Sequence, residues 1–367
     1  MRPEIADIIV IGAGVIGLAV ARQLALAGRE VLVLEANGSI GMETSSRNSG
    51  VIHAGIYYPP DSLKARCCVR GNQLLYDYCE KKHIPHARCG KLIIANSADQ
   101  QGRLKALQQN AISSGVDDLL WLDQARVHEL EPHISAEAGL LSPSTGVIDV
   151  HELMLALLAD MEAAGGTLIT HCKVLGGEAG DGCLKIKVDN GGEYTFTAAT
   201  VINAAGHGAA DIASKIAGFP ADKIPMVYPV SGHYFEYTGK LPFSRLIYPL
   251  PGNTGLGIHA TIDLAGQARF GPDAEYCDSV DFSFDESRKP AFAEAIRSWY
   301  PGLDDSRLQP GFVGVRPKLQ GPDEEFEDFV ISGPADHGIS GLVNLLGIDS
   351  PGLTACLTLA EEVVSRI

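Results

Sequence analysis

The chain has 367 residues, of which 46% are hydrophobic and 20% are charged, the composition of a folded globular protein. This length suits two domains, each able to bury its own core. Asp and Glu number 45 against 29 Lys and Arg, and the net charge of −16 leaves no general basic surface for a nucleic acid. No run approaches the roughly 20 apolar residues that a membrane span requires. Composition therefore excludes disordered, nucleic-acid-binding and transmembrane proteins.

The cysteines and the first residues bear on the cellular compartment. The 8 cysteines form no Cys-x-x-Cys pair and no zinc spacing, so we expect reduced thiols and no metal site. A glycine-rich motif begins at Gly12, too near Met1 to leave room for a signal peptide. We therefore expect a cytoplasmic protein, while a peripheral membrane contact through a few exposed apolar side chains stays open.

The first element is an apolar strand at 7–11 that ends in a glycine triplet, Gly12, Gly14 and Gly17. The first glycine of such a triplet permits a tight turn, the second lets backbone N–H groups approach a pyrophosphate, and the third lets a helix pack on the strand. Apolar residues at helical spacing follow over 15–27. The pattern places a diphosphate at the positive end of that helix.

A second apolar strand at 31–34 ends in Glu35, and Gly28 precedes it as a helix stop. An acidic residue at this place accepts hydrogen bonds from ribose hydroxyls. Strand, helix, strand and acid together predict a dinucleotide-binding βαβ unit.

Further elements follow in chain order. A helix is predicted from 61 or 62 to 82, a strand over 91–96, and a helix over 98–113 with Ser97 as its N-cap. Asp149 and Glu152 cap the next helix, 153–164, before a strand at 167–171, and 200–206 resembles a buried parallel strand that ends in small residues. Residues 226–284 favour an antiparallel sheet. The last elements are a helix at 286–299, strands around 312–315 and at 342–346, and a helix beginning at Pro351.

These elements predict an α/β fold, with a discontinuous Rossmann-type dinucleotide-binding domain and an α+β substrate domain on an antiparallel sheet. The expected division gives 1–85, 146–220 and 311–367 to the first domain, and 86–145 and 221–310 to the second.

Seven segments carry a family resemblance. They are the glycine unit with Glu35, 49–58, 62–65, 90–92, 146–149, 314–318 and 344–353. Together they resemble the FAD-dependent L-2-hydroxyglutarate dehydrogenase and oxidase group, within the D-amino-acid oxidase and glycerol-3-phosphate dehydrogenase superfamily. The resemblance covers nearly the whole chain. It implies bound FAD, hydride transfer from a substrate carbon to flavin N5, and a two-domain fold.

The resemblance also implies where the flavin lies. The segment after Gly50 is expected to approach the flavin ring, and the turn after Gly347 to place a helix start by its pyrimidine end, where N–H groups stabilise negative charge. Val174 is expected to contact the adenine through its backbone. The residues expected to hold the cofactor are Gly12, Gly14, Val15, Ile16, Gly17, Glu35, Ala36, Ser46, Asn48, Ser49, Gly50, Val51, Val174, Ala205, Gly206, Arg316, Gly347, Asp349, Ser350, Pro351, Gly352 and Leu353.

One departure concerns the substrate. The group commonly starts a substrate-domain strand with Arg-Gly-acid, where this chain has Ser231, Gly232 and His233. A guanidinium expected near the substrate is therefore absent, which leaves the identity of the acid open.

Oxidation of an alcohol beside a carboxylate needs a base and a cation. His53 and His259 compete for the role of base, and His53 is also a candidate for covalent flavin attachment. Arg316, fixed by the following proline, is the preferred carboxylate clamp. Tyr58, with its neighbour Tyr57, offers hydroxyl hydrogen bonds.

Lys318 ranks below Arg316 as a clamp, because Pro317 interrupts the strand. Lys64 is expected on a helix near the loop, and His233 receives no role.

The leading hypothesis is a flavoenzyme that oxidises a small L-2-hydroxy acid, with L-2-hydroxyglutarate as a candidate, to the 2-oxo acid. An oxidase or dehydrogenase of D-amino or N-methyl amino acids would use the same scaffold. A non-catalytic FAD-binding protein is the third alternative. The electron acceptor stays open among oxygen, a quinone and a carrier protein.

Overall fold

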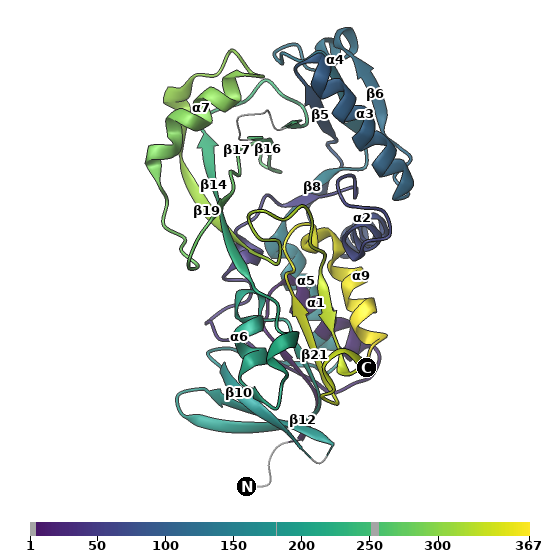
Figure 1. Ribbon diagram of the computed structural model, residues 1–367, viewed down its shortest axis with the longest axis vertical. Helices are drawn as coiled ribbons and strands as arrows, with labels where there is room; N and C mark the ends of the chain where they lie inside the picture. The colour runs from purple at the N-terminus through teal and green to yellow at the C-terminus, as the bar shows by residue number, and fades with distance from the viewer. Residues whose placement is uncertain (1–4, 181, 251–256) are drawn as a thin grey trace. The chain divides into compact units, whose positions relative to one another are not determined.

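The computed structural model describes residues 5–180, 182–250 and 257–367. The chain divides into two compact units (Figure 1). Unit 1 consists of Met1–Ser46, Val150–Pro229 and Arg316–Ile367, and unit 2 of Arg47–Asp149 and Val230–Val315. Both units are discontinuous in sequence.

Unit 1 is built on a mixed sheet with a parallel centre of strand order β9-β2-β1-β12-β21. The strands of this centre are β1 (Ile5–Ile11), β2 (Val31–Leu34), β9 (Thr167–Ile169), β12 (Glu193–Asn203) and β21 (Leu342–Leu346). Strands β10 (Lys173–Gly180), β11 (Cys183–Asp189), β13 (Ile216–Ala217) and β20 (Val330–Ser332) complete the sheet. The parallel centre confirms the predicted βαβ unit.

Three helices of unit 1 pack together beside the sheet, as Figure 1 shows: α1 (Val15–Leu26), α5 (Val150–Ala163) and α9 (Gly352–Val364). Shorter helices are α6 (Ala209–Ser214) and α8 (Pro334–His337). Against part of the sheet lies an apolar core that includes Ile9, Leu34 and Val201. This core fixes the ends of the parallel strands, where the predicted cofactor residues follow.

Unit 2 is built on a sheet of order β18-β14-β17-β16-β15-β5-β7-β6, with β19 beside β14. The bounds are β5 (Lys91–Ala95), β6 (Leu120–Asp123), β7 (Ala138–Ser142), β14 (Tyr228–Tyr237), β15 (Leu246–Pro249), β16 (Ala260–Ile262), β17 (Ala268–Phe270), β18 (Glu275–Tyr276) and β19 (Leu308–Lys318). The sheet is largely antiparallel, as expected, but β15 runs parallel to β5.

A small second sheet in unit 2 joins β3 (Val51–Ile52), β8 (Gly146–Ile148) and β4 (His86–Ala87). The helices are α2 (Leu63–Lys82), α3 (Ala98–Ser113), α4 (Gln124–Leu130) and α7 (Lys289–Arg297). Ser62 and Ser97 cap α2 and α3 by accepting from the N–H groups of Ala65 and Gln100. The predicted cap Ser97 is confirmed, and the helix predicted from 61 or 62 begins at Leu63, after its cap Ser62.

Residues 47–85, which we expected in the cofactor domain, group with unit 2. Asn110 of α3 donates to the carbonyls of Ile56 and Tyr58, at 3.0 and 2.8 Å. The side chains of Asn72 and Tyr76 on α2 donate to the carbonyl of Ser144. These hydrogen bonds tie 47–85 to the residues that follow it in unit 2.

Two other elements differ from expectation. β12 begins at Glu193 rather than near 200, because its first half pairs antiparallel with β11 before the second half pairs with β1. The last helix begins at Gly352, and Pro351 is its N-cap rather than its first residue.

Candidate functional site

The carboxyl ends of β1 and β12 meet in unit 1 at two glycines. Gly12 adopts a φ of +98°, and a Cβ there would lie 2.7 Å from the carbonyl oxygen of Ala204. A Cβ at Gly17 would collide with the carbonyl oxygen of Gly12. The N–H of Ala204 donates to the carbonyl of Ile11 at 2.9 Å. Only glycines fit this close passage of backbones, as the motif predicts.

The N-termini of two helices lie side by side in unit 1. Helix α1 has Gly14 as its N-cap, with no capping side chain and no acid in its first turn. A Cβ at Gly352, the first residue of α9, would lie 3.7 Å from Cδ1 of Ile16. Two positive helix ends therefore face one region, which suits a bound diphosphate. Ser45 Oγ accepts from the N–H of Val15, the first residue of α1, at 3.0 Å.

Glu35 lies at the end of β2, 7% exposed. Its Oε2 accepts from the N–H of Ala13 at 2.8 Å, and its Oε1 accepts from the backbone and side chain of Asn37 at 2.8 and 2.9 Å. A carboxylate has about four lone-pair sites, so a sugar hydroxyl can still donate to it. The backbone of Glu35 bonds Ile169 and Cys172. Ala36 directly follows Glu35, and Val174 lies two residues after Cys172, so both lie close in sequence to these backbone hydrogen bonds.

The turn after β21 also lies at the carboxyl end of a parallel strand of unit 1. Gly347 has a φ of +69° and packs against Leu319, and the N–H of Gly352 donates to the carbonyl of Asp349 at 2.6 Å. Oδ2 of Asp349 lies 3.8 Å from Nζ of Lys318. The sequence suggests Lys318 only as a carboxylate clamp ranked below Arg316, whereas in the structure its ammonium lies beside the turn.

A buried amide pair joins the two strands that flank this edge. Asn203 Nδ2 donates to Asn344 Oδ1 and to the carbonyl of Ala209, both at 2.8 Å. The pair fixes the end of β12, from which Ala205 and Gly206 follow. Paired helix ends, side-chain-free glycine positions and Glu35 fit FAD, whose diphosphate and ribose need these groups.

The segment from Ser46 to Val51 crosses from unit 1 to unit 2. Ser46 donates to the carbonyl of Glu43, and Asn48 Oδ1 accepts from the N–H of Gly50 at 2.8 Å. Ser49 Oγ lies 3.0 Å from the hydroxyl of Tyr234. These hydrogen bonds shape a turn in which Gly50 has a φ of +62°.

His53 follows β3 in unit 2. Asn72 Nδ2 and Cys68 Sγ of α2 donate to its carbonyl at 2.9 and 3.6 Å. Burial, followed by the nearby Lys91 ammonium, lowers the pKa of His53 to about 3. The imidazole is therefore neutral at physiological pH, and helix α2 fixes its backbone.

Lys91, which the sequence did not indicate as a site residue, lies near His53 and near the tyrosine that stacks on His259. Its Nζ is 4.7 Å from the ring centroid of Tyr57 and 4.9 Å from that of Tyr248. The ring of Tyr248 stacks on His259 at 3.6 Å between centroids. We call Lys91, His53, Cys68, Tyr57, Tyr248 and His259 the Lys91 cluster. All its members belong to unit 2.

The departure at His233 is accounted for by an ionic network within unit 2. Asp273 Oδ1 accepts from the backbone N–H of His233 at 2.7 Å and lies 3.2 Å from its Nδ1. Arg288 donates to Asp273 Oδ2 at 2.9 Å and also pairs with Glu275. His233 and Asp273 are both buried. The residue that replaces the family's acid thus forms part of a structural ion network.

Three further predicted residues, Arg316, Tyr58 and Lys64, lie outside the Lys91 cluster as defined above. Arg316 is partly buried on β19, just past the unit boundary, and the burial pattern of Arg316, Pro317 and Lys318 alternates as a strand requires. Tyr58 is held through its carbonyl by Asn110. Lys64 is buried in the first turn of α2, as expected for a helix residue near the loop.

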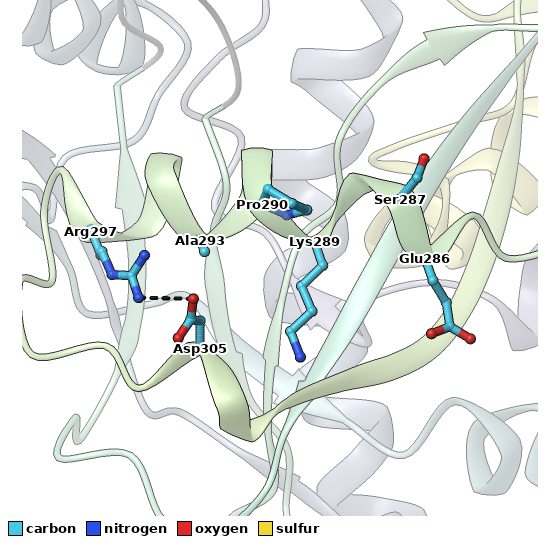
Figure 2. A pocket seen from close by; sticks show the side chains of 7 residues that line it. All are labelled: Glu286, Ser287, Lys289, Pro290, Ala293, Arg297 and Asp305. Carbon is cyan, nitrogen blue, oxygen red and sulfur yellow. Dashed lines mark ion pairs between the residues drawn. The ribbon is translucent and has the colours of Figure 1, made fainter.

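A surface pocket of about 470 Å³ lies beside α7 in unit 2, where Arg297 and Asp305 pair at 3.0 Å (Figure 2). It is lined by Glu286, Ser287, Lys289, Pro290, Ala293, Arg297 and Asp305. None of the predicted site residues lines it, so it takes no part in the chemistry discussed below.

Comparison with known proteins defines the class. The family model described as FAD dependent oxidoreductase matches residues 7–366, so the chain belongs to this DAO family and is an FAD-dependent oxidoreductase. It is homologous to L-2-hydroxyglutarate dehydrogenases. The mitochondrial enzyme of that name from Arabidopsis thaliana is 39% identical, over 99% of this chain and 83% of its own length. The human mitochondrial enzyme is 33% identical, over 98% and 88%.

A solved structure agrees with the family assignment. Dithionite-reduced L-α-glycerophosphate oxidase from Mycoplasma pneumoniae, with FAD bound, aligns over 99% of this chain and 94% of its own, with a TM-score of 0.89 and 26% identity. The expected fold class, cofactor and enzyme class are confirmed. In the described ranges, no helix is both long and apolar enough to span a bilayer.

Proposed function

We propose that this enzyme oxidises a small L-2-hydroxy acid, with L-2-hydroxyglutarate as the first candidate, to the 2-oxo acid. When bound, FAD supplies the acceptor for the hydride that leaves the carbinol carbon. Full-length similarity to relatives named for L-2-hydroxyglutarate supports this substrate.

His53 takes the hydroxyl proton in this proposal. The observation that carries the assignment is its neutral imidazole on a backbone fixed by α2, because a base must be unprotonated before the substrate arrives. A negatively charged substrate would raise the pKa of His53 from its low resting value, since an opposite charge favours the imidazolium. Proton transfer thus becomes favourable when the acid is bound.

Arg316 grips the carboxylate next to the carbinol. A guanidinium donates two parallel hydrogen bonds to a carboxylate, and Pro317 restricts the backbone that carries it. His259 is the competing base, and its stacking on Tyr248 fixes the plane of its ring.

An anaerobic screen of hydroxy and amino acids tests the proposal. We expect L-2-hydroxyglutarate to bleach the flavin absorbance and to yield a 2-oxo acid without ammonia or methylamine. Release of an amine would make the enzyme an amino-acid oxidase or dehydrogenase. Absence of bleaching by any acid would make the chain a non-catalytic FAD-binding protein.

The acceptor and the location are tested separately. Comparing reoxidation of the reduced enzyme by air, by a quinone and by a carrier protein identifies the acceptor. The cytoplasmic location stays a prediction, to be checked by fractionation of the source cells, and the same fractions reveal any peripheral membrane contact.

A further inference from the structure

Lys91 is buried by the alternation of its own strand. Along β5, Leu92 and Ile94 face one apolar core of unit 2, whereas Ile93 and Ala95 face the other. Side chains alternate along a strand, so Lys91 shares the face of Ile93. Its exposure is 0%, although its neighbours on that face are apolar. A lysine at such a place loses its hydration, which is costly for an ammonium group.

The ammonium of Lys91 lacks the partners that usually offset this cost. Within the described residues, Nζ has no hydrogen-bond acceptor. Its contacts are the faces of two tyrosine rings, Tyr57 and Tyr248, which attract a cation but accept no strong hydrogen bond. Cys68, the group whose charge favours the ammonium, has a raised pKa and is a neutral thiol. Three donor hydrogens therefore await an acceptor.

The two rings differ in their access to solvent. Tyr248 is 5% exposed and its ring contacts both the ammonium and the stacked His259, whereas Tyr57 is 41% exposed. Tyr57 is therefore the ring that can move into solvent without losing a stacked partner. An anion could reach Nζ by displacing it.

We propose that Lys91 is a specificity-determining residue that binds the second carboxylate of a dicarboxylic hydroxy acid, after the Tyr57 ring swings aside. A carboxylate supplies the missing acceptors and the missing negative charge in one group. The inference rests on the proposed function, and it assigns a cation to the end of the substrate that Arg316 does not grip.

The same contact would act on His53. The Lys91 charge is one cause of the low pKa of this histidine. A carboxylate beside Lys91 cancels that charge, so the imidazole becomes a stronger base when a dicarboxylate is bound. The affinity for a dicarboxylate and the basicity of His53 thus both depend on the ion pair between Lys91 and the second carboxylate.

Binding of unreactive acids to the oxidised FAD-loaded enzyme tests the assignment without turnover. Glutarate and pentanoate have equal chain length and differ in one carboxylate. Measured by calorimetry, Lys91→Met should weaken the binding of glutarate at least about tenfold and leave the affinity for pentanoate within about twofold of that of the unmodified enzyme. Lys91→Arg should recover part of the glutarate affinity. Lys105→Met removes an exposed lysine that also lies over an aromatic ring, Trp121, and should change neither affinity.

A measurement on the unmodified enzyme serves if Lys91→Met does not fold. Burial lowers the pKa of Lys91 to about 7, and only the ammonium form attracts a carboxylate. The preference for glutarate over pentanoate should therefore fall as the pH rises from 6 to 9. His53, Tyr57, Tyr248 and Cys68 surround the ammonium and are neutral over this range in the ligand-free enzyme, because their pKa values there lie well outside it.

Three outcomes would overturn the assignment: unchanged glutarate affinity in Lys91→Met, an equal loss of both acids, or a preference that does not vary with pH. Failure of the proposed function would look different. In that case no hydroxy acid bleaches the flavin, although glutarate still binds through Lys91.

Discussion

The proposed cofactor edge of unit 1, formed by Gly12, Gly17, Glu35 and the N-termini of α1 and α9, and the Lys91 cluster of unit 2 are built in opposite ways. The proposed cofactor edge consists mainly of backbone N–H groups, small residues and helix ends, together with the carboxylate of Glu35. The Lys91 cluster relies on five charged, polar or aromatic side chains around one ammonium. Backbone sites depend on local spacing, whereas side-chain clusters depend on which distant strands become neighbours. The two regions should therefore respond differently to substitution.

The largest effect is expected at Gly17. Gly17→Ala should abolish FAD retention, because the new Cβ collides with the carbonyl oxygen of Gly12 and pushes α1 off β1. The flavin content of the purified protein measures it. Gly180→Ala is the matched control in the same unit, with no atom within 4 Å of the new Cβ. Full flavin content in Gly17→Ala would contradict the proposed cofactor edge.

His53→Asn should slow flavin reduction about 100-fold or more while FAD stays bound, since a positioned base contributes factors of this order. Anaerobic stopped-flow absorbance gives the rate. His259→Asn is the companion variant, and a larger loss there would transfer the role of base to His259.

Arg316→Met should weaken the binding of the acid that bleaches the flavin by about 2–5 kcal/mol. This is the cost of removing one partner of a buried charge pair. The substrate concentration at half-maximal reduction rate measures it. Unchanged saturation would remove Arg316 as the clamp.

Lys91→Met should stabilise the protein, unlike the other substitutions. The folded pKa of about 7 lies below the ordinary 10.5, so the buried ammonium destabilises the native state fully below pH 7, and this penalty fades as the pH rises toward 10.5. We expect a gain on the order of 1–4 kcal/mol at pH 6 and a smaller gain at pH 10, from denaturant unfolding of both proteins. A loss of stability would mean that Lys91 is a structural residue.

The smallest effect concerns pH. Because the pKa of free His53 is about 3, the second-order rate of flavin reduction at low substrate concentration, which reports the free enzyme, should show no acid limb near the ordinary histidine value of 6.5. Rates measured from pH 5 to 8 check this expectation. A limb centred at 6.5 would indicate a solvated histidine as the base.

The contrast between the regions also explains what could be predicted. Gly12, Gly17 and Glu35 lie within one βαβ unit, where spacing fixes their geometry, and the cap Ser97 is equally local. Lys91 was missed because a lysine at the start of an apolar strand is usually exposed. Its environment arises only when β15 pairs with β5 and brings Tyr248 to the same face.

Other misses have the same origin. The first half of β12 was missed because its exposed polar residues look like a loop until β11 pairs with them. The hydrogen bond from the N–H of Val15 to Ser45 Oγ was not predicted either, because it depends on the turn at Thr44–Ser46. The role of His233 depends on Asp273 and Arg288, which no local pattern connects to it.

The amide pair Asn203–Asn344 has a consequence for biosynthesis. It joins β12 to β21, and β21 leaves the ribosome only after every strand of unit 2. While unit 2 is synthesised and folds, the edge of β12 that later pairs with β21 therefore stays unpaired. A stable flavin complex is expected only once translation has delivered β21 and α9, so apoprotein maturation should follow synthesis rather than accompany it.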